Sequence, residues 1–548
     1  MEAAHTSFIK QRRGDLFGGL TAAIVALPLA LAFGVASGAG ALAGLYGAIF
    51  VGFFAAVFGG TRHQVSGPTG PMTVVMALII AQSSGNLTLA FAAVVLAGGF
   101  QILFGLFGIG RYVKLVPQPV VSGFMSGIGV IIIILQLAPA LGFDPPSGAI
   151  VVKLAALPAM ISQPNWQALV LCAACLAIMI ATPKRIAALV PPPLLAILIG
   201  TAAGLLFLRS APVIGTIPSG LPEVTLPSLK LADVPLLVRF ALILAFLGSI
   251  DSLLTSLVAD SVTRTHHDSN RELIGQGIGN VAAGLFGGIA GAGATMRTLV
   301  NIRAGATTRF SGALHAVVLL LLVLGFGGAA SYIPLSVLAG ILLKVGFDII
   351  DWRYLKRIHV VPRAGVVIML TTLLATVFVD LMTAVAVGIV MAALLFVSRM
   401  ADAQMESARI AFSPEHATDL SPEEAAILDR AAGRIVLFHV EGPLSFGSAR
   451  DIARMLQTSP EKDALVIDLS DVPFIDTSAS MALEEAILGL RDLNDRVILA
   501  GMRPRVSDTL RKTGVLQLLV PDQIASSRLE ALKAAESYTT ANGNTPSP

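Results

Sequence analysis

The sequence predicts an α-helical polytopic membrane protein that ends in a smaller α/β domain, and composition and charge carry this prediction. The chain has 548 residues, of which 55% are hydrophobic and 13% charged, and its mean hydropathy is +0.81. Apolar stretches of roughly 18–25 residues recur from Leu16 to Val397, each long enough to cross a bilayer as a helix. The first 400 residues hold 23 Lys/Arg against 12 Asp/Glu, whereas the remainder holds 14 against 22. A basic membrane body is therefore followed by an acidic soluble domain.

The membrane body, residues 15–400, follows a short N-terminus of residues 1–14 and divides into fourteen hydrophobic segments. In chain order they lie at 16–37, 41–60, 68–82, 88–109, 118–141, 167–182, 190–208, 236–259, 275–290, 294–302, 312–328, 333–346, 365–381 and 383–398. Loops after even-numbered segments carry most basic residues, namely Arg62, Arg111, Lys114, Lys184, Arg185, Arg264, Arg271, Arg303, Arg309, Arg353, Lys356 and Arg357. Loops after odd-numbered segments carry few, namely Lys153, Arg209 and Lys230. This bias predicts a multi-pass protein of the cell (inner) membrane with both termini in the cytoplasm.

Two short segments interrupt the pattern, the third, "SGPTGPMTVVMALIIAQ", and the tenth, "GAGATMRTLVNI". Each is broken by glycine or proline, begins with small and hydroxyl residues, and is the third segment in a half of seven. Short, broken segments in matching positions of two halves are typical of inverted-repeat transporters, whose substrate site lies near the bilayer midplane. Two half-helices that aim their positive N-termini and free N–H groups at one point suit an anion. The alternative is that the glycines only allow close helix packing.

The eighth segment contains "LGSIDSLLTSLVADS", with Asp251 near its middle and Thr255 four residues later. Residues four apart share one face of a helix. A carboxylate at this depth costs about a few kcal/mol and usually marks an ion pathway. Asp251 could coordinate Na⁺, a hard cation that prefers oxygen ligands, or it could take up a proton. A structural ion pair with Arg297 is the remaining alternative.

Six stretches of the membrane body carry a family resemblance. In chain order they are "GDLFGGLTAAIVALPLALAFGVASG", "SGPTGPMTVVMA", "SGFMSGIG", "ELIGQGIGN", "GGIAGAGATMRTLVNI" and "LAGILLKVGFDIIDW". Together they resemble the sulfate permease (SulP) family of anion transporters. Within that family, the chain looks most similar to the sodium-dependent bicarbonate transporters of cyanobacteria.

The resemblance implies a fold, a mechanism and two sets of site residues. Seven plus seven inverted repeats would form a core of segments one to four and eight to eleven, which slides against a gate in an elevator-like motion. An anion, bicarbonate in the cyanobacterial transporters, would bind between segments three and ten at Thr69, Gly70, Ala294, Thr295, Met296 and Arg297. A sodium ion would bind at Thr69, Asp251, Thr255, Gly293 and Thr295. The resemblance also implies a homodimer.

Arg297 departs from the cyanobacterial pattern, in which a glycine stands at this position. A fixed positive charge beside the substrate favours anions of higher charge, such as sulfate or C4-dicarboxylates, or it tightens the binding of a monovalent anion. Bicarbonate by Na⁺ symport is therefore the first expectation. Sulfate or dicarboxylate transport coupled to protons is the alternative.

The C-terminal part alternates short apolar strands with amphipathic helices, an α/β pattern. After a linker of residues 401–432, residues 433–537 resemble the STAS domain that follows the membrane part in this family, and residues 538–548 are expected to be a disordered tail. Ser478 in "DTSA" matches the serine that is phosphorylated in related anti-sigma factor antagonists, although Ala479 replaces their glycine. Ser478 is thus either a regulatory site or a helix N-cap.

Other function classes lack their signatures. The chain has no Walker A motif, which argues against an ATP-driven pump, and "GQGIGN" at 275–280 is a poor match to a dinucleotide fingerprint. No nucleophile, acid–base dyad or metal cluster suggests an enzyme, and no nucleic-acid partner is expected. Three classes remain: a secondary transporter, an anion channel, and a sensor that signals through the C-terminal domain and a cytoplasmic partner. A carboxylate beside an anion site favours coupling to a cation, and hence the transporter.

Overall fold

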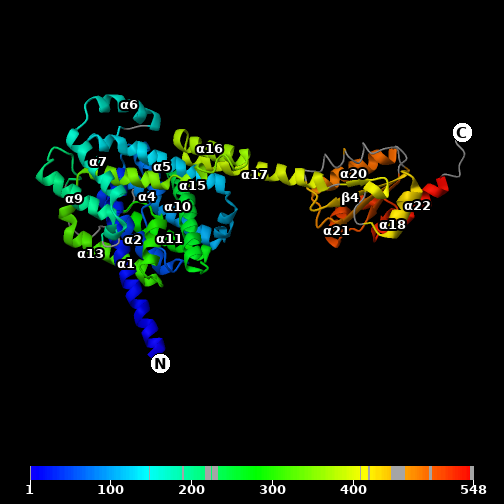
Figure 1. Cartoon of the computed structure of the whole chain (residues 1–548), viewed down its shortest axis with the longest axis horizontal. Helices are drawn as coiled ribbons and strands as arrows, with labels where there is room; N and C mark the ends of the chain where they lie inside the picture. Colours follow the sequence, from blue (N-terminus) through cyan, green and yellow to red (C-terminus); the bar gives the residue numbers. More distant parts are fainter. Residues whose placement is uncertain are drawn as a thin grey trace. The chain divides into compact units, whose positions relative to one another are not determined.

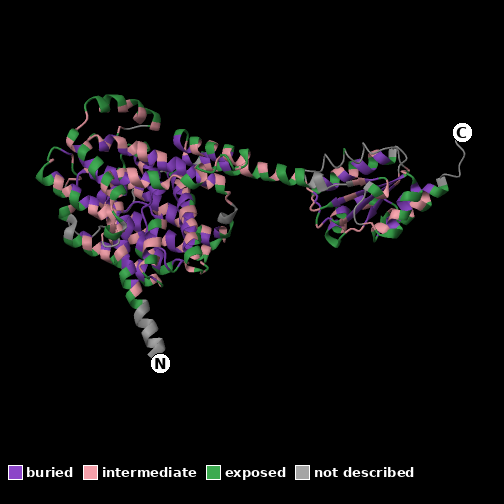
Figure 2. Cartoon of the chain, viewed as in Figure 1, coloured by how far each residue is buried: buried purple, intermediate pink, exposed green. Residues whose placement is uncertain are grey.

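The chain forms two compact units, Met1–Val390 and Met391–Pro548 (Figure 1). The structure is a computed structural model. It describes residues 2–146, 149–187, 190–215, 224, 233–407, 409–416, 420–445, 454, 463–492 and 496–542. Buried residues concentrate in the interior of each unit, and exposed residues line its outer helices (Figure 2).

The first unit is helical apart from one short pair of strands. Its first half contains α1 (Glu2–Ala36), α2 (Ala41–Phe58), β1 (Ser66–Gly67), α3 (Gly70–Gln82), α4 (Leu87–Leu106), η1 (Ile109–Leu115), α5 (Gln118–Ala140), α6 (Ile150–Ser162), α7 (Trp166–Ala181), α8 (Lys184–Ala187) and α9 (Pro192–Leu206). Its second half contains α10 (Val234–Thr263), α11 (Ser269–Leu285), β2 (Ala292–Gly293), α12 (Thr295–Arg303), α13 (Arg309–Ala330), α14 (Leu335–Ile349), α15 (Trp352–Leu355), α16 (Arg363–Phe378) and α17 (Leu381–Ser407). Helix α17 continues into the second unit.

Each of the fourteen segments predicted from the sequence overlaps one of these helices, so that number fits the structure. By length and composition alone, six described helices can cross a membrane, namely α1 from Arg12, α2, α4, α5, α10 and α17 from Thr383. Helices α6 and α7 also pass this test as a pair, bent by 112°. Helix α6 was not predicted. It is apolar but has only 13 residues, which include Lys153 and Pro158, and this is too short to cross a bilayer alone.

The helices of the first unit pack in two groups. One group, called the core group here, contains α1–α4 and α10–α13, which pack mainly against one another. The other, the gate group, contains α5, α7, α9, α14, α16 and α17. In it α5 packs on α14 and α16, α7 packs on α9 and α14, and Gly388 of α17 lies against Val120 of α5. These are the two sets of segments that the family resemblance assigned to the core and the gate.

The second unit has a five-stranded sheet between two layers of helices. The strands are β3 (Arg409–Ala411), β4 (Ile435–Glu441), β5 (Ala464–Asp471), β6 (Arg496–Ala500) and β7 (Ile524–Ala525). They pair in this order, antiparallel between β3 and β4 and parallel otherwise. The helices are α18 (Pro422–Ala431) and α22 (Arg528–Asn542) on one face, and α20 (Thr477–Asp492) and α21 (Pro504–Lys512) on the other. Two apolar cores result, one on each face of the sheet.

The structure places elements in two stretches that the sequence interpretation left without them. Within the predicted linker 401–432, α18 packs against α22 and buries Ile427 and Leu428 in the core of the second unit. Within the predicted tail 538–548, residues 538–542 continue α22, and residues 543–548 lie outside the described part of the chain. For α18 a local signal was present, because Ser421 and Glu424 form a capping box and Pro422 stands at the helix start.

Candidate functional site

Two broken helices meet inside the core group through a short antiparallel strand pair. Ser66 of β1 pairs with Gly293 of β2, and Gly67 pairs with Ala292. Each strand is followed at once by a half-helix: α3 begins after Thr69, and α12 begins after Ala294. The first N–H groups of a helix have no intrahelical acceptor, so both half-helices present free N–H groups and positive dipole ends near this crossing.

Glycine is required where the two strands cross. Gly67 has φ +150°, and a Cβ atom there would lie 2.8 Å from Nη1 of Arg297 and 3.1 Å from Cα of Ala48. A Cβ atom on Gly293 would overlap the side-chain amide of Gln64. The glycines that made these segments look unlike membrane helices therefore allow the two chain segments to approach each other.

Three of the predicted sodium ligands lie in direct contact. The Thr255 hydroxyl is 2.8 Å from that of Thr295, and it donates to the Gly293 carbonyl oxygen at 3.0 Å. Asp251 lies one turn before Thr255 on α10, close to the Thr69 side chain. Asp251 Oδ2 and Thr69 Oγ1 are buried, and neither has a hydrogen-bond partner among the described residues. This set of hydroxyl, carbonyl and carboxylate oxygens fits a hard cation such as Na⁺.

Arg297 is buried beside these groups, with 2% of its surface exposed. Its Nη2 donates to the carbonyl oxygen of Pro68, just before α3, at 2.6 Å. Its Nη1 has no hydrogen-bond partner in the described part of the chain. Arg297 also interacts electrostatically with Asp251. One arginine of α12 thus links the entrance of α3 to the carboxylate of α10 and keeps a donor available.

The remaining predicted anion ligands are placed differently. Ala294 is the N-cap of α12, and its N–H donates to the Val65 carbonyl oxygen at 3.0 Å. Gly70 faces the gate group, because a Cβ atom there would lie 2.7 Å from Ile132 and 2.8 Å from Ile349. Met296, between Thr295 and Arg297 in the first turn of α12, is 66% exposed.

The space next to the site is small in this conformation. A cavity of about 10 Å³ between α10, α5 and α17 borders Asp251, which is about the room that one water needs. A larger apolar cleft of about 430 Å³ lies beside it, between the core group and the gate group. Phe124 and Val385 of the gate group line both spaces.

Helix α11 contributes a row of polar residues that the sequence interpretation missed. Glu272, Gln276 and Asn280 are spaced four apart on one face, and all three are buried. Gln276 donates to Ser66 of β1 at 2.6 Å and to Glu272 at 2.9 Å. Asn280 exchanges two hydrogen bonds with the backbone of Gly291, which precedes β2, at 2.8 and 3.0 Å. The row therefore supports the approach to both half-helices.

Glu272 completes the row at the start of α11. Its carboxylate accepts the N–H groups of Gly60 and Thr61, both at 2.8 Å, and the side-chain amide of Gln64 at 2.8 Å. These bonds fix the loop that leads from α2 into β1. The sequence signal for this row is the spacing of four between the polar residues of "ELIGQGIGN", which places them on one face of a helix.

In the second unit, Ser478 is exposed and lies in the first turn of α20. The Asp476 side chain accepts the N–H of Ala479 at 2.8 Å and so caps this helix. The expectation that Ser478 is the N-cap is therefore wrong, because α20 begins one residue earlier, at Thr477. The buried thiols Cys172 and Cys175 on α7 belong to no group that could hold a metal among the described residues.

Two helical groups surround a pair of half-helices, an oxygen cluster suited to a cation, and a buried arginine. This arrangement defines a membrane anion transporter. Comparison with known proteins agrees. The profile of the Sulfate permease family matches residues 13–372, and that of the STAS domain matches residues 426–531. The chain belongs to the Sulfate permease family.

Individual relatives support this assignment. The Bicarbonate transporter BicA of Picosynechococcus sp. is 46% identical over 98% of this chain and 96% of its own length. The Bacillus subtilis protein YvdB, whose name assigns it provisionally to sulfate transport, is 34% identical over 91% of this chain and 93% of its own length. The solved transmembrane domain of a cyanobacterial BicA is 51% identical, with a TM-score of 0.65 over 68% of this chain and 97% of that domain. Murine Slc26a9 shares the fold, with a TM-score of 0.82 over 96% of this chain and 91% of its own at 18% identity.

Proposed function

We propose that this protein imports bicarbonate together with Na⁺. The observation that carries the proposal is the oxygen cluster formed by Thr255, Gly293 and Thr295, with the unpartnered oxygens of Asp251 and Thr69 beside it. The similarity to proteins named as bicarbonate transporters supports bicarbonate as the anion.

The geometry suggests why the two ions would move together. A bare Asp251 carboxylate repels an anion that approaches the free N–H groups of α3 and α12. A sodium ion on the oxygen cluster offsets this charge, so the anion gains most of its attraction once the cation is bound. Arg297 adds a positive charge with one unused N–H donor. Cation and anion would therefore bind cooperatively at one crossing.

We further propose that the core group moves as a body against the gate group and carries the site with it. Both broken helices and α10 belong to the core group, so the site would travel intact. The contacts across the boundary are apolar where Gly70 meets Ile132 and Ile349, and the neighbouring cleft is lined almost entirely by apolar side chains. An apolar boundary has no hydrogen bonds to break when it slides. This arrangement suits an elevator-like motion.

The proposed orientation follows from the basic loops. It places both chain ends, the loop from α2 to β1 and the α10–α11 turn on the cytoplasmic side of the inner membrane. The exposed Ser478 would then face the cytoplasm, where a partner or a kinase could reach it.

A second candidate substrate is sulfate or a dicarboxylate, taken up with protons. Arg297 favours it, because a buried guanidinium with a free N–H can bind a divalent oxyanion through charge-assisted hydrogen bonds. In this case Asp251 would carry the proton. The similarity to YvdB points in the same direction.

Uptake by the purified protein in liposomes tests these proposals. Labelled bicarbonate, sulfate and succinate are compared with an inward Na⁺ gradient, with choline in its place, and at lower external pH. We expect bicarbonate to accumulate above its external concentration only with Na⁺. Sulfate uptake in choline that rises at low external pH would support the second candidate. Flux without accumulation would indicate a channel, and the absence of flux a sensor.

Thr255→Val is the sharpest variant for the cation site, with Thr263→Val on the same helix as its matched control. Thr255 contacts Gly293 and Thr295, whereas the Thr263 hydroxyl, among the described residues, bonds only to Ala259 and Thr265 at the end of α10. We expect the first variant to raise the Na⁺ concentration needed for half-maximal uptake. The control should leave it unchanged.

A further inference from the structure

The carbonyl oxygen of Gly293 is the one backbone group among the proposed cation ligands, so its position depends on what holds this residue. Thr255 donates to that oxygen at 3.0 Å, and the Gly293 N–H donates to the Ser252 hydroxyl at 3.0 Å. Ser252 and Thr255 both belong to α10, and both are buried. Helix α10 therefore holds the two polar backbone groups of Gly293.

A third group, the side-chain amide of Gln64, closes another side of Gly293. Gln64 lies in the loop between α2 and β1 and is 4% exposed. A Cβ atom on Gly293 would lie 2.2 Å from Nε2 of Gln64 and 2.7 Å from its Cδ. The amide thus fills the space directly beside the Gly293 Cα atom, and Gly293 has no room to move on that side.

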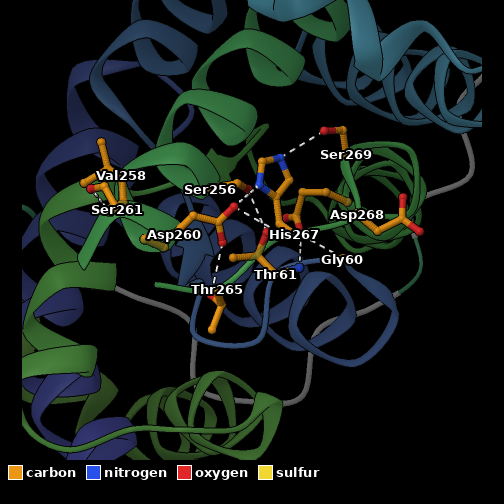
Figure 3. Close-up of polar contacts among 12 residues, drawn as sticks. Gly60, Thr61, Ser256, Val258, Asp260, Ser261, Thr265, His267, Asp268 and Ser269 are labelled. Carbon is orange, nitrogen blue, oxygen red and sulfur yellow. Dashed lines mark hydrogen bonds and ion pairs between the residues drawn. The ribbon is translucent and has the colours of Figure 1, made fainter. Parts of the chain in front are cut away.

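The Gln64 amide is itself held at both of its ends. Its Oε1 accepts the Ser256 hydroxyl of α10 at 2.8 Å, and its Nε2 donates to Glu272 of α11 at 2.8 Å. An ionised carboxylate only accepts hydrogen bonds, so Nε2 rather than Oε1 faces Glu272. The Ser256 hydroxyl is also 2.7 Å from that of Thr61, in the same loop as Gln64 (Figure 3). These bonds leave the amide one orientation.

The turn from α10 to α11 joins the two helices that hold Gln64. Near the end of α10, Asp260 accepts the backbone N–H of His267 at 3.0 Å and lies 2.7 Å from its Nδ1 (Figure 3). The His267 Nε2 is 2.9 Å from the hydroxyl of Ser269, the first residue of α11. Because the two helices are tied in this way, Ser256 and Glu272 keep their separation on either side of the amide.

We propose that Gln64 is a positioning residue of the cation site, which holds the Gly293 carbonyl oxygen in place and thereby favours Na⁺ over Li⁺. The proposal rests on the Na⁺ site proposed above. Groups behind metal ligands set affinity because they orient the atoms that touch the ion. Selection between hard cations of different radius depends on the size and flexibility of the cavity. A fixed carbonyl oxygen cannot move in to meet the smaller Li⁺ ion, and loss of the Gln64 amide removes this restraint.

Cation binding to the purified full-length protein tests the proposal. It is measured as the rise in melting temperature with Na⁺ or Li⁺, with choline replacing either cation at constant ionic strength. The test variant is Gln64→Ala, and the control is Gln136→Ala, which removes another buried glutamine (5% exposed) from α5 of the gate group. We expect Gln64→Ala to weaken Na⁺ binding about tenfold and Li⁺ binding by less than about threefold. The control should leave both affinities unchanged.

The ratio of the two affinities separates positioning from a general loss of stability. Equal losses for Na⁺ and Li⁺, or an unchanged Na⁺ affinity, would overturn this inference and leave the Na⁺ site in place. A wild-type protein that binds the two cations equally would overturn it as well. A wild-type protein without any Na⁺-specific shift would overturn the proposed function, and this inference with it.

A milder variant keeps the proposal testable if Gln64→Ala fails to fold. Ser256→Ala removes one hydroxyl, which bonds to Oε1 of Gln64, and leaves the amide in place. We expect the same change in the Na⁺-to-Li⁺ ratio with a smaller loss of Na⁺ affinity. An unchanged ratio in this variant would contradict the positioning role.

Discussion

The two broken helices share a backbone frame but differ in their side chains. Helix α3 continues from Thr69 into thirteen mostly buried residues, such as Met72 and Val75, that pack in the apolar core. Helix α12 has nine residues, and the ones it buries are Arg297, Thr298 and Asn301. One half-helix is therefore a packing element that offers its N-terminus, and the other carries most of the polar groups of the site.

The repeated backbone frame and the side chains of the proposed site therefore make separate contributions. Strand pairing and the two helix N-termini depend on backbone groups, which both halves supply, although Pro71 in the first turn of α3 has no N–H. Apart from the Gly293 carbonyl oxygen, the proposed cation ligands and the guanidinium are side-chain groups, and most of these come from α10 and α12. A symmetric frame thus holds an asymmetric site. Substitutions on the α10–α12 side should alter ion binding more than those on the α3 side.

Asp251→Asn should have the largest effect and reduce Na⁺-driven uptake to background. The exchange removes the only carboxylate of the proposed cation site and leaves neutral ligands beside Arg297. Initial uptake in liposomes measures the effect. Asp348→Asn is the control, because Asp348 is exposed and in the described part of the chain pairs only with Lys344. Undiminished Na⁺-dependent uptake by Asp251→Asn would show that the Asp251 carboxylate is not needed for Na⁺ coupling.

Arg297→Gly should follow, with an effect that depends on the charge of the anion. Losing hydrogen bonds from a charged donor costs about 1.5–3 kcal/mol, so a divalent anion should bind on the order of ten- to hundredfold more weakly. Bicarbonate keeps the N–H groups of both half-helices and should lose less. Competition assays compare sulfate with bicarbonate, and Arg303→Gly at the exposed end of α12 is the matched control. Equal losses for both anions would make Arg297 a structural residue.

Gln276 holds the strand before α3, and Asn280 holds the strand before α12. Gln276→Leu and Asn280→Leu should each reduce Na⁺-driven uptake less than the two variants above. The first removes the bond to Ser66 before α3, and the second removes the pair with Gly291 before α12. Each leaves buried polar groups unpaired, which costs about 1–3 kcal/mol in the free energy of unfolding. We expect Asn280→Leu to raise the half-saturating Na⁺ concentration more than Gln276→Leu, at similar losses in melting temperature. The reverse order would contradict the asymmetric site.

The smallest effect concerns the second unit, where a histidine and an aspartate of neighbouring strands form a hydrogen bond. His439 of β4 donates from Nδ1 to Asp468 of β5 at 2.9 Å, and this bond raises the pKa of His439 despite its burial. Glu441 and Asp471, each 3.6 Å from Nε2, face it as well, and Asp471 favours the charged form while Arg528 of α22 opposes it. The same bond helps to hold the pKa of Asp468 below its ordinary value, against the effect of burial.

The sign of this linkage decides the expected pH dependence. Because the pKa of His439 is raised on folding, its stabilisation is complete below the unfolded value of about 6.5 and is lost as the pH rises through the folded value. His439→Gln should therefore weaken hydrogen-exchange protection of β4 and β5 at about pH 5.5 and change it little at about pH 8. Mass spectrometry of both proteins at each pH measures this. Equal losses at both pH values would show a packing effect instead.

The sequence by itself determined the class of protein and marked the segments that carry its candidate site. Apolar runs report membrane helices directly, because each span must satisfy its own backbone and expose apolar side chains. Glycine, proline and hydroxyl residues inside two of those runs marked the half-helices, and Asp251 and Thr255 shared a face by spacing alone. These are local signals, and a helix preserves them in the fold.

Only the tertiary structure decided which groups touch. Glu272 binds Gly60 and Gln64, more than two hundred residues earlier in the chain, and Arg297 reaches Pro68 across the two halves. It also decided that α18 belongs to the second unit rather than to a linker. Such contacts depend on how distant segments pack and on which buried polar groups find partners there. Local patterns in the sequence do not show which distant groups will become hydrogen-bond partners.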